Sequence, residues 1–326
     1  MSEAQPVLMQ GTALSKTFER GAANWFARRR TPVWAVRDVS LHVAAGETYG
    51  LVGESGSGKS TLGRLLLRLV PTDAGRIAFD GLDITDLNAA ALRPLRRRMQ
   101  IIFQDPYSSL NPRMTVQQAL AEPLQVHKLT QSKSDTDTRV LELADRVGLR
   151  KDQLNRYPHE FSGGQRQRIG IARALSLRPD FVVCDEPVSA LDVSIQAQIL
   201  NLLMGLQEEL GAAYLFVSHD LRVVEHVAHR VGVMYRGQIV EEGPTQEVYR
   251  HPAHPYTRRL LAAIPTFDAR ASLPVVSDTP TRSVKSGCAF AATCDRFRVG
   301  TCDLAAPRLA EIPDGTGHQV ACHFAG

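Results

Sequence analysis

The chain has 326 residues, enough for one large domain or two modest ones, and its 44% hydrophobic and 22% charged residues are typical of a globular protein. The net charge is only +4, and no uninterrupted apolar run approaches the ~20 residues that a membrane-spanning helix requires. These values argue against an integral membrane protein.

The first residues, MSEAQPVLMQ, lack the basic region and following apolar region of a secretory signal peptide. We therefore expect a cytosolic protein that reaches a membrane only through a partner. Basic residues cluster at 27–32, 93–100 and 256–261, without the interleaved aromatic residues of a single-strand binding platform. Such runs are usually solvated faces, with contact to lipid head groups or a partner as the alternative, and we expect no nucleic-acid partner.

The stretch GESGSGKST lies between a predicted buried strand at 47–52 and a predicted leucine-rich helix at 60–70 that Pro71 ends. It matches G-x-x-x-x-G-K-S, the phosphate-binding loop, in the strand–loop–helix context that this loop requires. Glycines let backbone N–H groups approach phosphate oxygens, and the helix N-terminus adds the positive end of its dipole. Lys59 would reach the β- and γ-phosphates of a nucleotide, and Ser60 would ligate Mg²⁺. The candidate nucleotide-binding residues of this loop are Gly53, Ser55, Gly56, Gly58, Lys59, Ser60 and Thr61.

The next predicted strand, MQIIFQD at 99–105, ends in Gln104. A glutamine amide at this place can touch both the Mg²⁺ ion and the water that attacks the nucleotide. Without the other motifs, an exposed glutamine at the end of a strand would be the simpler interpretation.

The segment EFSGGQRQRIGIARAL, residues 160–175, predicts a helix with Ser162 as its N-cap. Two glycines at the start of this helix again favour the close approach of an anion. Because one loop already holds the phosphates, the simplest explanation is that this second site contacts a nucleotide bound by another subunit.

Two further apolar strands, FVVCDEP at 181–187 and AAYLFVSHD at 212–220, end in polar residues. A continuous apolar run is typical of a buried parallel strand, and ligands bind at the carboxyl ends of such strands. We therefore expect Asp185 to hold Mg²⁺ through water, and Glu186 to act as the general base or to hold the attacking water. His219 can bind the γ-phosphate and orient that base. Isolated acids at a strand end, or a lone histidine, would otherwise be structural.

Taken in chain order, these motifs and the SALD turn at 189–192 resemble those of the ATP-binding subunits of ABC transporters, over roughly residues 8–245. The resemblance implies an α/β P-loop NTPase fold in which two subunits enclose two ATP molecules. It implies that the signature SGGQ contacts the ATP of the opposite subunit, that Asp192 links the two sites, and that Phe18 stacks on adenine, unless Phe18 is a core aromatic. The signature residues are Ser162, Gly163, Gly164 and Gln165, preceded here by Phe161 where leucine is commoner.

The resemblance also divides the chain. Residues 1–260 would form the ABC ATP-binding domain, with an α-helical subdomain inserted at about 105–170, and residues 261–326 would form a C-terminal extension. Two segments with helical apolar spacing, MTVQQALAEPLQVHKL and TRVLELADRVGL, flank the polar connection TQSKSDTDT. In transporters of this family the helical subdomain contacts the membrane subunits, and movement around Gln104 couples the site to the pore.

Two segments point to one branch of the family. HPYT at 254–257, within the stretch at 243–265, and FQDPYSSLNPRMTV at 103–116 resemble the ATPases of oligopeptide and dipeptide importers. This resemblance implies a peripheral subunit on the cytoplasmic face of the membrane. Its partners would be a second ATPase subunit, homologous or identical, two transmembrane permease subunits and an extracytoplasmic substrate-binding protein. The alternatives are an importer ATPase for another solute, such as a nickel complex or glutathione, and a soluble ABC ATPase acting on nucleic acid or ribosomes.

Four of the five cysteines lie in the last part of the chain, after a predicted extended linker at 265–287 that is rich in proline, serine and threonine. Cytosolic thiols stay reduced, so this clustering suggests a metal site rather than disulfides. The ending resembles that of peptide-type ATPases with a [4Fe–4S] cluster on four such cysteines. Zinc, with His318 or His323 as further ligands, and free thiols are the alternatives. The predicted ligands are Cys288, Cys294, Cys302 and Cys322.

Overall fold

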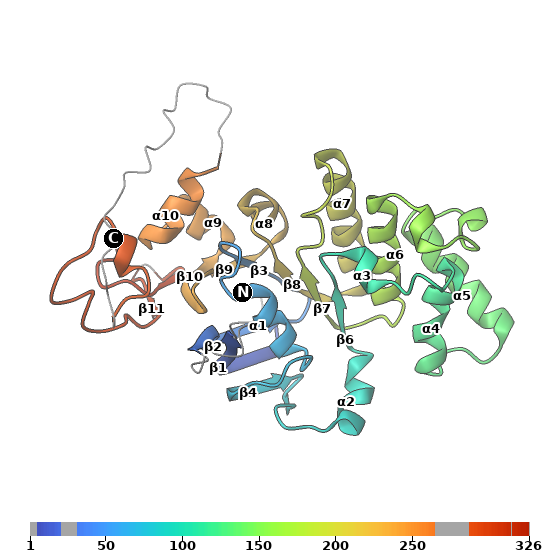
Figure 1. Cartoon of the computed structure of the whole chain (residues 1–326), viewed down its shortest axis with the longest axis horizontal. Helices are drawn as coiled ribbons and strands as arrows, with labels where there is room; N and C mark the ends of the chain where they lie inside the picture. The colour runs from blue at the N-terminus through green and yellow to red at the C-terminus, as the bar shows by residue number, and fades with distance from the viewer. Residues whose placement is uncertain (1–4, 21–30, 265–286, 314, 326) are drawn as a thin grey trace, which may run out of the picture.

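The computed structural model describes residues 5–20, 31–264, 287–313 and 315–325. The predicted linker and the first basic run fall almost wholly outside these residues. A large central sheet carries a smaller sheet on one side, while helices α3–α7 gather at one end and the C-terminal segment lies at the other (Figure 1). This is the α/β class that the sequence predicts.

The central sheet has eight strands in the order β11-β12-β10-β9-β3-β8-β7-β6. The strands from β9 to β6 are parallel, whereas β10, β12 and β11 are added antiparallel at one edge. Every residue of β3, β7 and β8 is buried, which explains why these strands appear in the sequence as continuous apolar runs. The strands are β3 (Thr48–Val52), β6 (Met99–Ile102), β7 (Phe181–Asp185), β8 (Ala213–Val217), β9 (Arg230–Tyr235), β10 (Gln238–Pro244), β11 (Ala310–Glu311) and β12 (Gln319–Val320).

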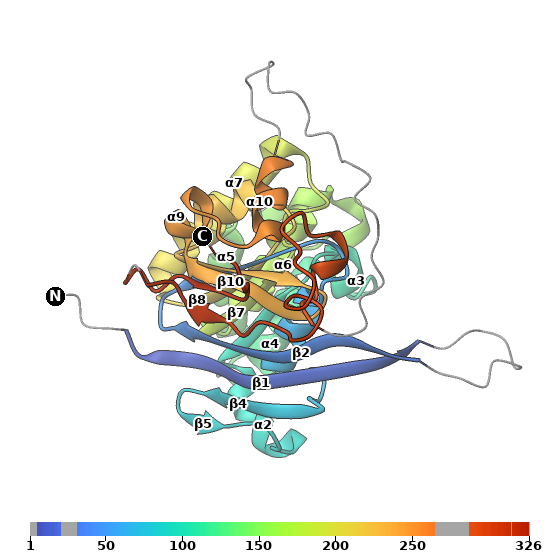
Figure 2. The same cartoon turned by 90° about the vertical axis from the view of Figure 1, so that its left-hand side faces the viewer.

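The smaller sheet is antiparallel, with the order β2-β1-β4-β5. Its two long strands run beside each other along the molecule (Figure 2). Together with α1 this sheet covers one face of the central sheet, because Phe181 and Val183 of β7 pack on that side and Val182 and Cys184 pack on the other. The strands are β1 (Val7–Arg20), β2 (Thr31–Ala44), β4 (Ala74–Phe79) and β5 (Leu82–Asp83).

The helices follow the strands on both faces, and none in the described part of the chain is long and apolar enough to cross a membrane. Those that pack near the sheets are α1 (Lys59–Leu66), α2 (Ala89–Arg96), α8 (Leu221–Val227), α9 (Thr245–Arg250) and α10 (Pro255–Ala262). Those at the far end are α3 (Pro106–Ser109), α4 (Val116–Val126), α5 (Lys133–Arg146), α6 (Gly163–Leu175) and α7 (Val193–Leu210). Single 3₁₀ turns occur at Lys151–Gln153, Pro158–Glu160 and Ala291–Thr293.

Helices α4, α5 and α6 pack against one another in the segment where the sequence predicts a helical subdomain. One boundary differs from the prediction, because α5 begins inside the polar stretch that was expected to connect two helices. The Ser132 hydroxyl caps α5 by accepting a hydrogen bond from the backbone N–H of Asp135 at 3.1 Å. A short polar residue that caps a helix therefore resembles a loop residue in the sequence.

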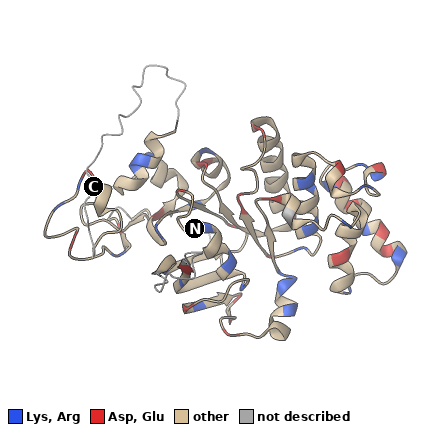
Figure 3. Ribbon diagram, viewed as in Figure 1, with Lys and Arg blue, Asp and Glu red and all other residues tan. Residues whose placement is uncertain are grey.

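The helix after the phosphate loop is also shorter than predicted, since α1 ends at Leu66 rather than near residue 70. Arg68 turns into the left-handed region, with φ of 53°, and its carbonyl accepts a hydrogen bond from Arg96 at 2.8 Å. Arg96 also donates to the Leu67 carbonyl at 2.6 Å. The ribbon of α2 is blue at its Arg residues in Figure 3, and one of them, Arg96 of the basic run at 93–100, caps the end of α1.

The C-terminal segment docks on the central sheet. Strand β12 pairs with β10, and the backbone N–H of Ala321 donates to the Val240 carbonyl at 2.8 Å. Phe290 and Cys294 are buried against the helical side of the core. Both views show this segment against β10 and α10 (Figures 1 and 2), so the cysteine-containing segment extends the core sheet.

Candidate nucleotide-binding and catalytic site

The phosphate loop follows β3 and leads into α1, as the sequence predicts. Gly53 and Gly58 have backbone φ values of 146° and 108°, which residues other than glycine rarely adopt. A Cβ atom on Gly53 would lie 2.1 Å from the Met234 carbonyl oxygen, and one on Gly58 would lie 2.0 Å from that of Ala35. The backbone packing of the loop therefore requires glycine at both positions.

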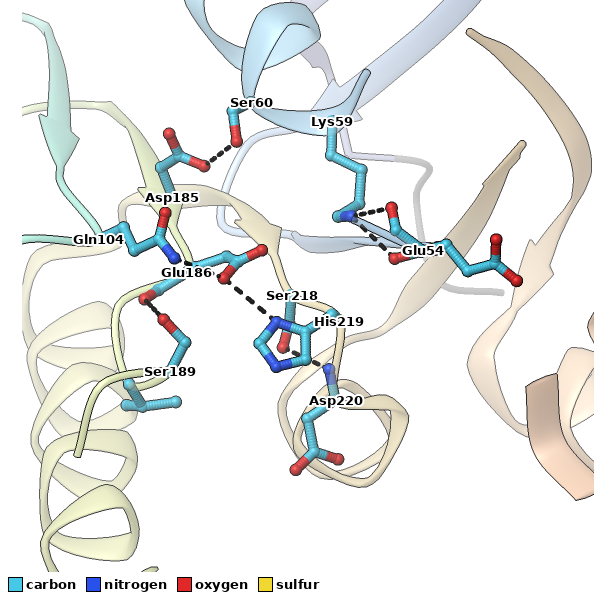
Figure 4. Close-up of polar contacts among 12 residues, drawn as sticks. Glu54, Lys59, Ser60, Gln104, Asp185, Glu186, Ser189, Ser218, His219 and Asp220 are labelled. Atoms are coloured by element: carbon cyan, nitrogen blue, oxygen red, sulfur yellow. Dashed lines mark hydrogen bonds and ion pairs between the residues drawn. The ribbon is translucent and has the colours of Figure 1, made fainter. Parts of the chain in front are cut away.

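Lys59 is buried at the first position of α1, and its ammonium group points back across the loop (Figure 4). The Nζ atom donates to the carbonyl oxygens of Gly53 at 2.7 Å and Glu54 at 2.9 Å. Burial lowers the pKa of Lys59, and the nearby carboxylates of Glu186, Asp185 and Glu54 oppose this shift. The structure therefore holds a partly desolvated cation beside the loop, where phosphate oxygens could replace the two carbonyls.

Ser60 and Asp185 form the pair that the sequence assigns to Mg²⁺. The Ser60 hydroxyl donates to Oδ1 of Asp185 at 2.6 Å, and only 2% of Asp185 is exposed. A hydroxyl and a carboxylate at one strand end are oxygen ligands of the kind that Mg²⁺ prefers. Arg64 lies 3.6 Å from the other carboxylate oxygen, a contact that the sequence analysis missed although Arg64 follows Ser60 by one helical turn.

Glu186, Gln104 and His219 come together just beyond the carboxyl ends of β6, β7 and β8 (Figure 4). Oε2 of Glu186 accepts a hydrogen bond from Nε2 of Gln104 at 3.0 Å and lies 3.1 Å from Nδ1 of His219. Glu186 has a φ of 49°, and its backbone N–H is held by the Val217 carbonyl at 2.9 Å. The backbone of Glu186 is thus held in a rare conformation, and its carboxylate is held by Gln104 and His219. A carboxylate in this position can accept a proton from a water molecule next to the phosphate loop.

The signature residues lie at the start of α6. The Ser162 hydroxyl accepts a hydrogen bond from the Gln165 N–H at 3.4 Å, while the Gln165 side chain accepts one from the Ser162 N–H at 3.1 Å. Ser162 is thus the N-cap that the sequence predicts, and its side-chain bonds lie within α6 rather than with the phosphate loop. A Cβ atom on Gly164 would lie 2.5 Å from a methyl group of Ile195, so close packing against α7 explains this glycine.

The signature helix, the Gln104 segment and the turn after Glu186 line a common cavity of about 210 Å³. Its walls include Gln104, Tyr107, Gly163, Arg166 and Pro187. Asp192 lies at the end of that turn, where it is exposed as the N-cap residue of α7. The three segments that surround the predicted reaction are therefore in contact with one another.

Phe18 lies near the end of β1, and 46% of it is exposed. It is paired with Val33 of β2, and Nζ of Lys16 lies 5.8 Å from the centre of its ring. A half-exposed aromatic ring on a sheet edge offers a flat apolar surface on which a base could stack.

None of the four C-terminal cysteines forms a disulfide bond within the described residues. The N–H of Cys288 donates to the Cys302 carbonyl at 2.8 Å. Burial raises the pKa of the Cys288 thiol, and the nearby Cys302 and Cys322 raise it further; burial likewise raises the pKa of Cys294 to about 11. Within the described ranges, no three His, Cys, Asp or Glu side chains are arranged to hold a metal ion.

The two histidines considered as zinc ligands have other contacts. Nε2 of His318, a side chain that is 1% exposed, lies 2.8 Å from the Glu241 carboxylate. Nε2 of His323 lies 2.9 Å from the Ala305 carbonyl oxygen. The structure therefore places a ring nitrogen of each histidine on an oxygen partner.

A glycine-rich phosphate loop, a serine–aspartate pair for Mg²⁺, and a carboxylate beside glutamine and histidine at the strand ends are the parts of a P-loop NTPase. The inserted helices with SGGQ at the start of α6 narrow this class to the ATP-binding cassette ATPases. The comparisons with known proteins agree, because the ABC transporter family model matches residues 36–189. A second model, for the C-terminal region of oligopeptide/dipeptide transporters, matches residues 240–302.

An oligopeptide transport ATP-binding protein of Streptococcus mutans is 53% identical over 268 residues, which cover 82% of this chain and 85% of that protein. The chain therefore belongs to the ABC transporter family, as an ATP-binding subunit of the oligopeptide/dipeptide type. A glutathione import ATP-binding protein of Salmonella paratyphi A is 52% identical over 290 residues, 87% of this chain and 46% of that protein. A solved dimeric ATP-binding cassette, in a post-hydrolysis state bound to ADP and Pi, superposes on this chain with a TM-score of 0.66 and 29% sequence identity. The match spans 73% of this chain and 99% of the solved chain.

Proposed function

We propose that the chain powers the import of dipeptides or oligopeptides across the cytoplasmic membrane by hydrolysing ATP. The observation that carries this proposal is the match of residues 240–302 to the C-terminal region of oligopeptide/dipeptide transporters, in a chain whose residues 36–189 match the ABC transporter family. Residues 1–260 form the ATP-binding domain, with the helical subdomain at about 105–170, and residues 261–326 form the extension. The chain acts as a peripheral subunit on the cytoplasmic face of the membrane.

The chemistry follows from the contacts at the strand ends. Lys59 would leave the two carbonyls and bind phosphate oxygens, and Ser60, Asp185 and Gln104 would hold the Mg²⁺ ion, which would neutralise negative charge on the phosphates. Glu186 accepts the proton of the attacking water, and His219 holds the carboxylate in position and contacts the γ-phosphate. The loop residues Gly53, Ser55, Gly56, Gly58 and Thr61 supply backbone and hydroxyl contacts, and Phe18 stacks on the adenine ring.

Two such subunits work together. SGGQ of one subunit, Ser162 to Gln165, binds the γ-phosphate held by the other, and Asp192 connects the two sites. ATP binding closes the pair and hydrolysis reopens it. The pair sits below two transmembrane permease subunits, to which an extracytoplasmic binding protein delivers the substrate. The common cavity beside Gln104 supports a coupling of the reaction to the helical subdomain.

The second candidate is import of another solute, because a glutathione import ATP-binding protein is as similar to this chain as an oligopeptide one. A nickel complex belongs to the same class of alternatives. A soluble ABC ATPase acting on nucleic acid or ribosomes is disfavoured by the peptide-type C-terminal match.

We expect short peptides to stimulate the ATPase of the complete transporter. The complex would be captured through a tag on this chain, reconstituted in lipid, and assayed with its binding protein and peptides of two to eight residues. Stimulation that depends on peptide length separates dipeptide from oligopeptide import. An active complex that responds to glutathione or a nickel complex, and to no peptide, would contradict peptide import while leaving the ATPase intact.

We also propose that the C-terminal thiols hold a [4Fe–4S] cluster with a structural role, and that zinc is the alternative. The support is that four cysteines lie within one short C-terminal segment, Cys288 to Cys322, where a metal would stabilise a part of the chain with little core of its own. After anaerobic purification we expect about four iron atoms and as many acid-labile sulfides per chain, the content of such a cluster on four cysteines. Replacing Cys302 by serine should remove both, while the same change at buried Cys184 should remove neither. Zinc without sulfide would contradict the cluster.

A further inference from the structure

The C-terminal region reaches the phosphate loop through one hydroxyl group. Tyr256 of α10 is fully buried, and its Oη accepts a hydrogen bond from the backbone N–H of Glu54 at 3.0 Å, across 202 residues of sequence. The Glu54 carbonyl in turn accepts from Lys59 at 2.9 Å. The second residue of the loop is thus held on one side by Tyr256 and on the other by the lysine that contacts phosphate.

Tyr256 is itself held by aromatic rings. Its ring centre lies 4.5 Å from that of Tyr235 on β9 and 5.5 Å from that of Phe290, two residues after Cys288 in the cysteine-containing segment. Phe290 also packs edge-on against Tyr235, with 5.3 Å between the centres. Phe290 is 3% exposed, so the C-terminal segment supplies one wall of the site that fixes the Tyr256 ring.

The buried carboxylate of Glu241 also connects the start of α10 with the C-terminal segment. Glu241 of β10 is fully buried and accepts hydrogen bonds from the N–H groups of Ala253 at 2.6 Å and His254 at 2.9 Å. It also contacts His318, which precedes β12. The start of α10 and the C-terminal segment therefore share one anchor on the central sheet.

His254 fixes the orientation of α10. Its Nδ1 accepts a hydrogen bond from the Tyr256 N–H at 3.0 Å, which requires an unprotonated nitrogen. Burial lowers the pKa of His254 to about 4, and Glu241 opposes that shift, so the ring remains a neutral cap at physiological pH. Tyr256 is thus held by its ring, by its N–H and by its hydroxyl, and it has little freedom to move away from the loop.

We infer that Tyr256 is a positioning residue for the phosphate loop, through which the C-terminal extension raises the affinity of the loop for ATP. A loop whose second residue is already fixed loses less conformational entropy when it wraps around phosphates. The Glu54 N–H that donates to Tyr256 lies at the start of the loop. Removing this hydrogen bond should therefore change how firmly the loop is held before ATP binds, while Gln104, Glu186 and His219 keep their positions. This inference rests on ATP binding at the loop, as proposed above.

The test measures the dissociation constant of Mg²⁺–ATP by calorimetry on the full chain carrying Glu186→Gln, which stops turnover. Tyr256→Phe keeps the ring and removes the hydroxyl, and we expect the dissociation constant to rise about three- to tenfold, the effect of one hydrogen bond. With Glu186 restored in the transporter, KM for ATP should rise by the same factor while kcat stays within about twofold. Tyr235→Phe is the matched control, since it removes a hydroxyl from the same aromatic group and should change neither constant.

The role of the extension is tested by Phe290→Leu. We expect it to raise the dissociation constant in the same direction, and the double variant with Tyr256→Phe to be less than additive, because both changes act through one contact. A lower thermal midpoint of Tyr256→Phe with unchanged ATP affinity would overturn the inference and leave a structural role alone. A shift in Tyr256→Phe without any in Phe290→Leu would overturn the part assigned to the extension. A parent chain that does not bind ATP would overturn the proposed function itself.

Discussion

We expect Glu186→Gln to lower the rate of ATP hydrolysis by about a hundred- to ten-thousandfold, the contribution of a general base, while ATP binding remains. The carboxylate accepts from Gln104 and faces His219, so an amide of the same shape fits the same place. An amide cannot take the proton of the attacking water. Single-turnover hydrolysis and the ATP dissociation constant, measured on the same preparation, separate the loss of chemistry from a loss of binding.

Glu208→Gln is the matched control for this prediction. Glu208 is exposed on α7, away from the strand ends, so its variant should hydrolyse ATP at the original rate. Hydrolysis by Glu186→Gln within about tenfold of the original rate, below the usual general-base effect, would remove Glu186 from the role of base. His219 and Gln104 would then be the remaining candidates at this place.

The meeting of Gln104, Glu186 and His219 at the candidate site was predictable, because each of them follows a strand that is easily recognised in the sequence. The runs before Gln104, Glu186 and His219 are short and apolar, and β7 and β8 are wholly buried. Carboxyl ends of neighbouring parallel strands meet at one edge of a sheet, so the sequence order alone predicts that these side chains meet. The loop glycines were predictable from the spacing of their motif. The structure explains Gly53 and Gly58, because backbone carbonyl oxygens lie where their side chains would be.

The docking of the C-terminal segment was not predictable in the same way. Strands β11 and β12 have two residues each, too few for an alternating pattern to appear in the sequence. The contacts of Tyr256 with Glu54 and of His318 with Glu241 are single hydrogen bonds between distant parts of the chain. No local propensity encodes such a bond, and only the assembled sheet brings these partners together.

A second substitution with a large expected effect on ATP binding is that of Lys59, whose charge is costly to bury. Because the pKa of Lys59 is lowered in the folded chain, the folded state binds fewer protons than the unfolded state in the pH window just below the ordinary value of 10.5. Stability therefore rises with pH through that window, and below it the charged side chain weakens folding. A neutral side chain of similar length should fold at least as well at neutral pH, which makes loss of binding distinguishable from loss of structure.

We expect Lys59→Met to weaken ATP binding at least about a hundredfold, because a charge-assisted contact to phosphate in a partly desolvated site is worth several kcal/mol. The thermal midpoint without nucleotide should be unchanged or higher, and the increase that Mg²⁺–ATP gives the parent chain should disappear. Lys133→Met, at an exposed position at the start of α5, should keep both the midpoint and the increase. Retained affinity in Lys59→Met, within about threefold, would mean that the two carbonyls keep the ammonium group in the bound state and that the loop backbone alone holds the phosphates.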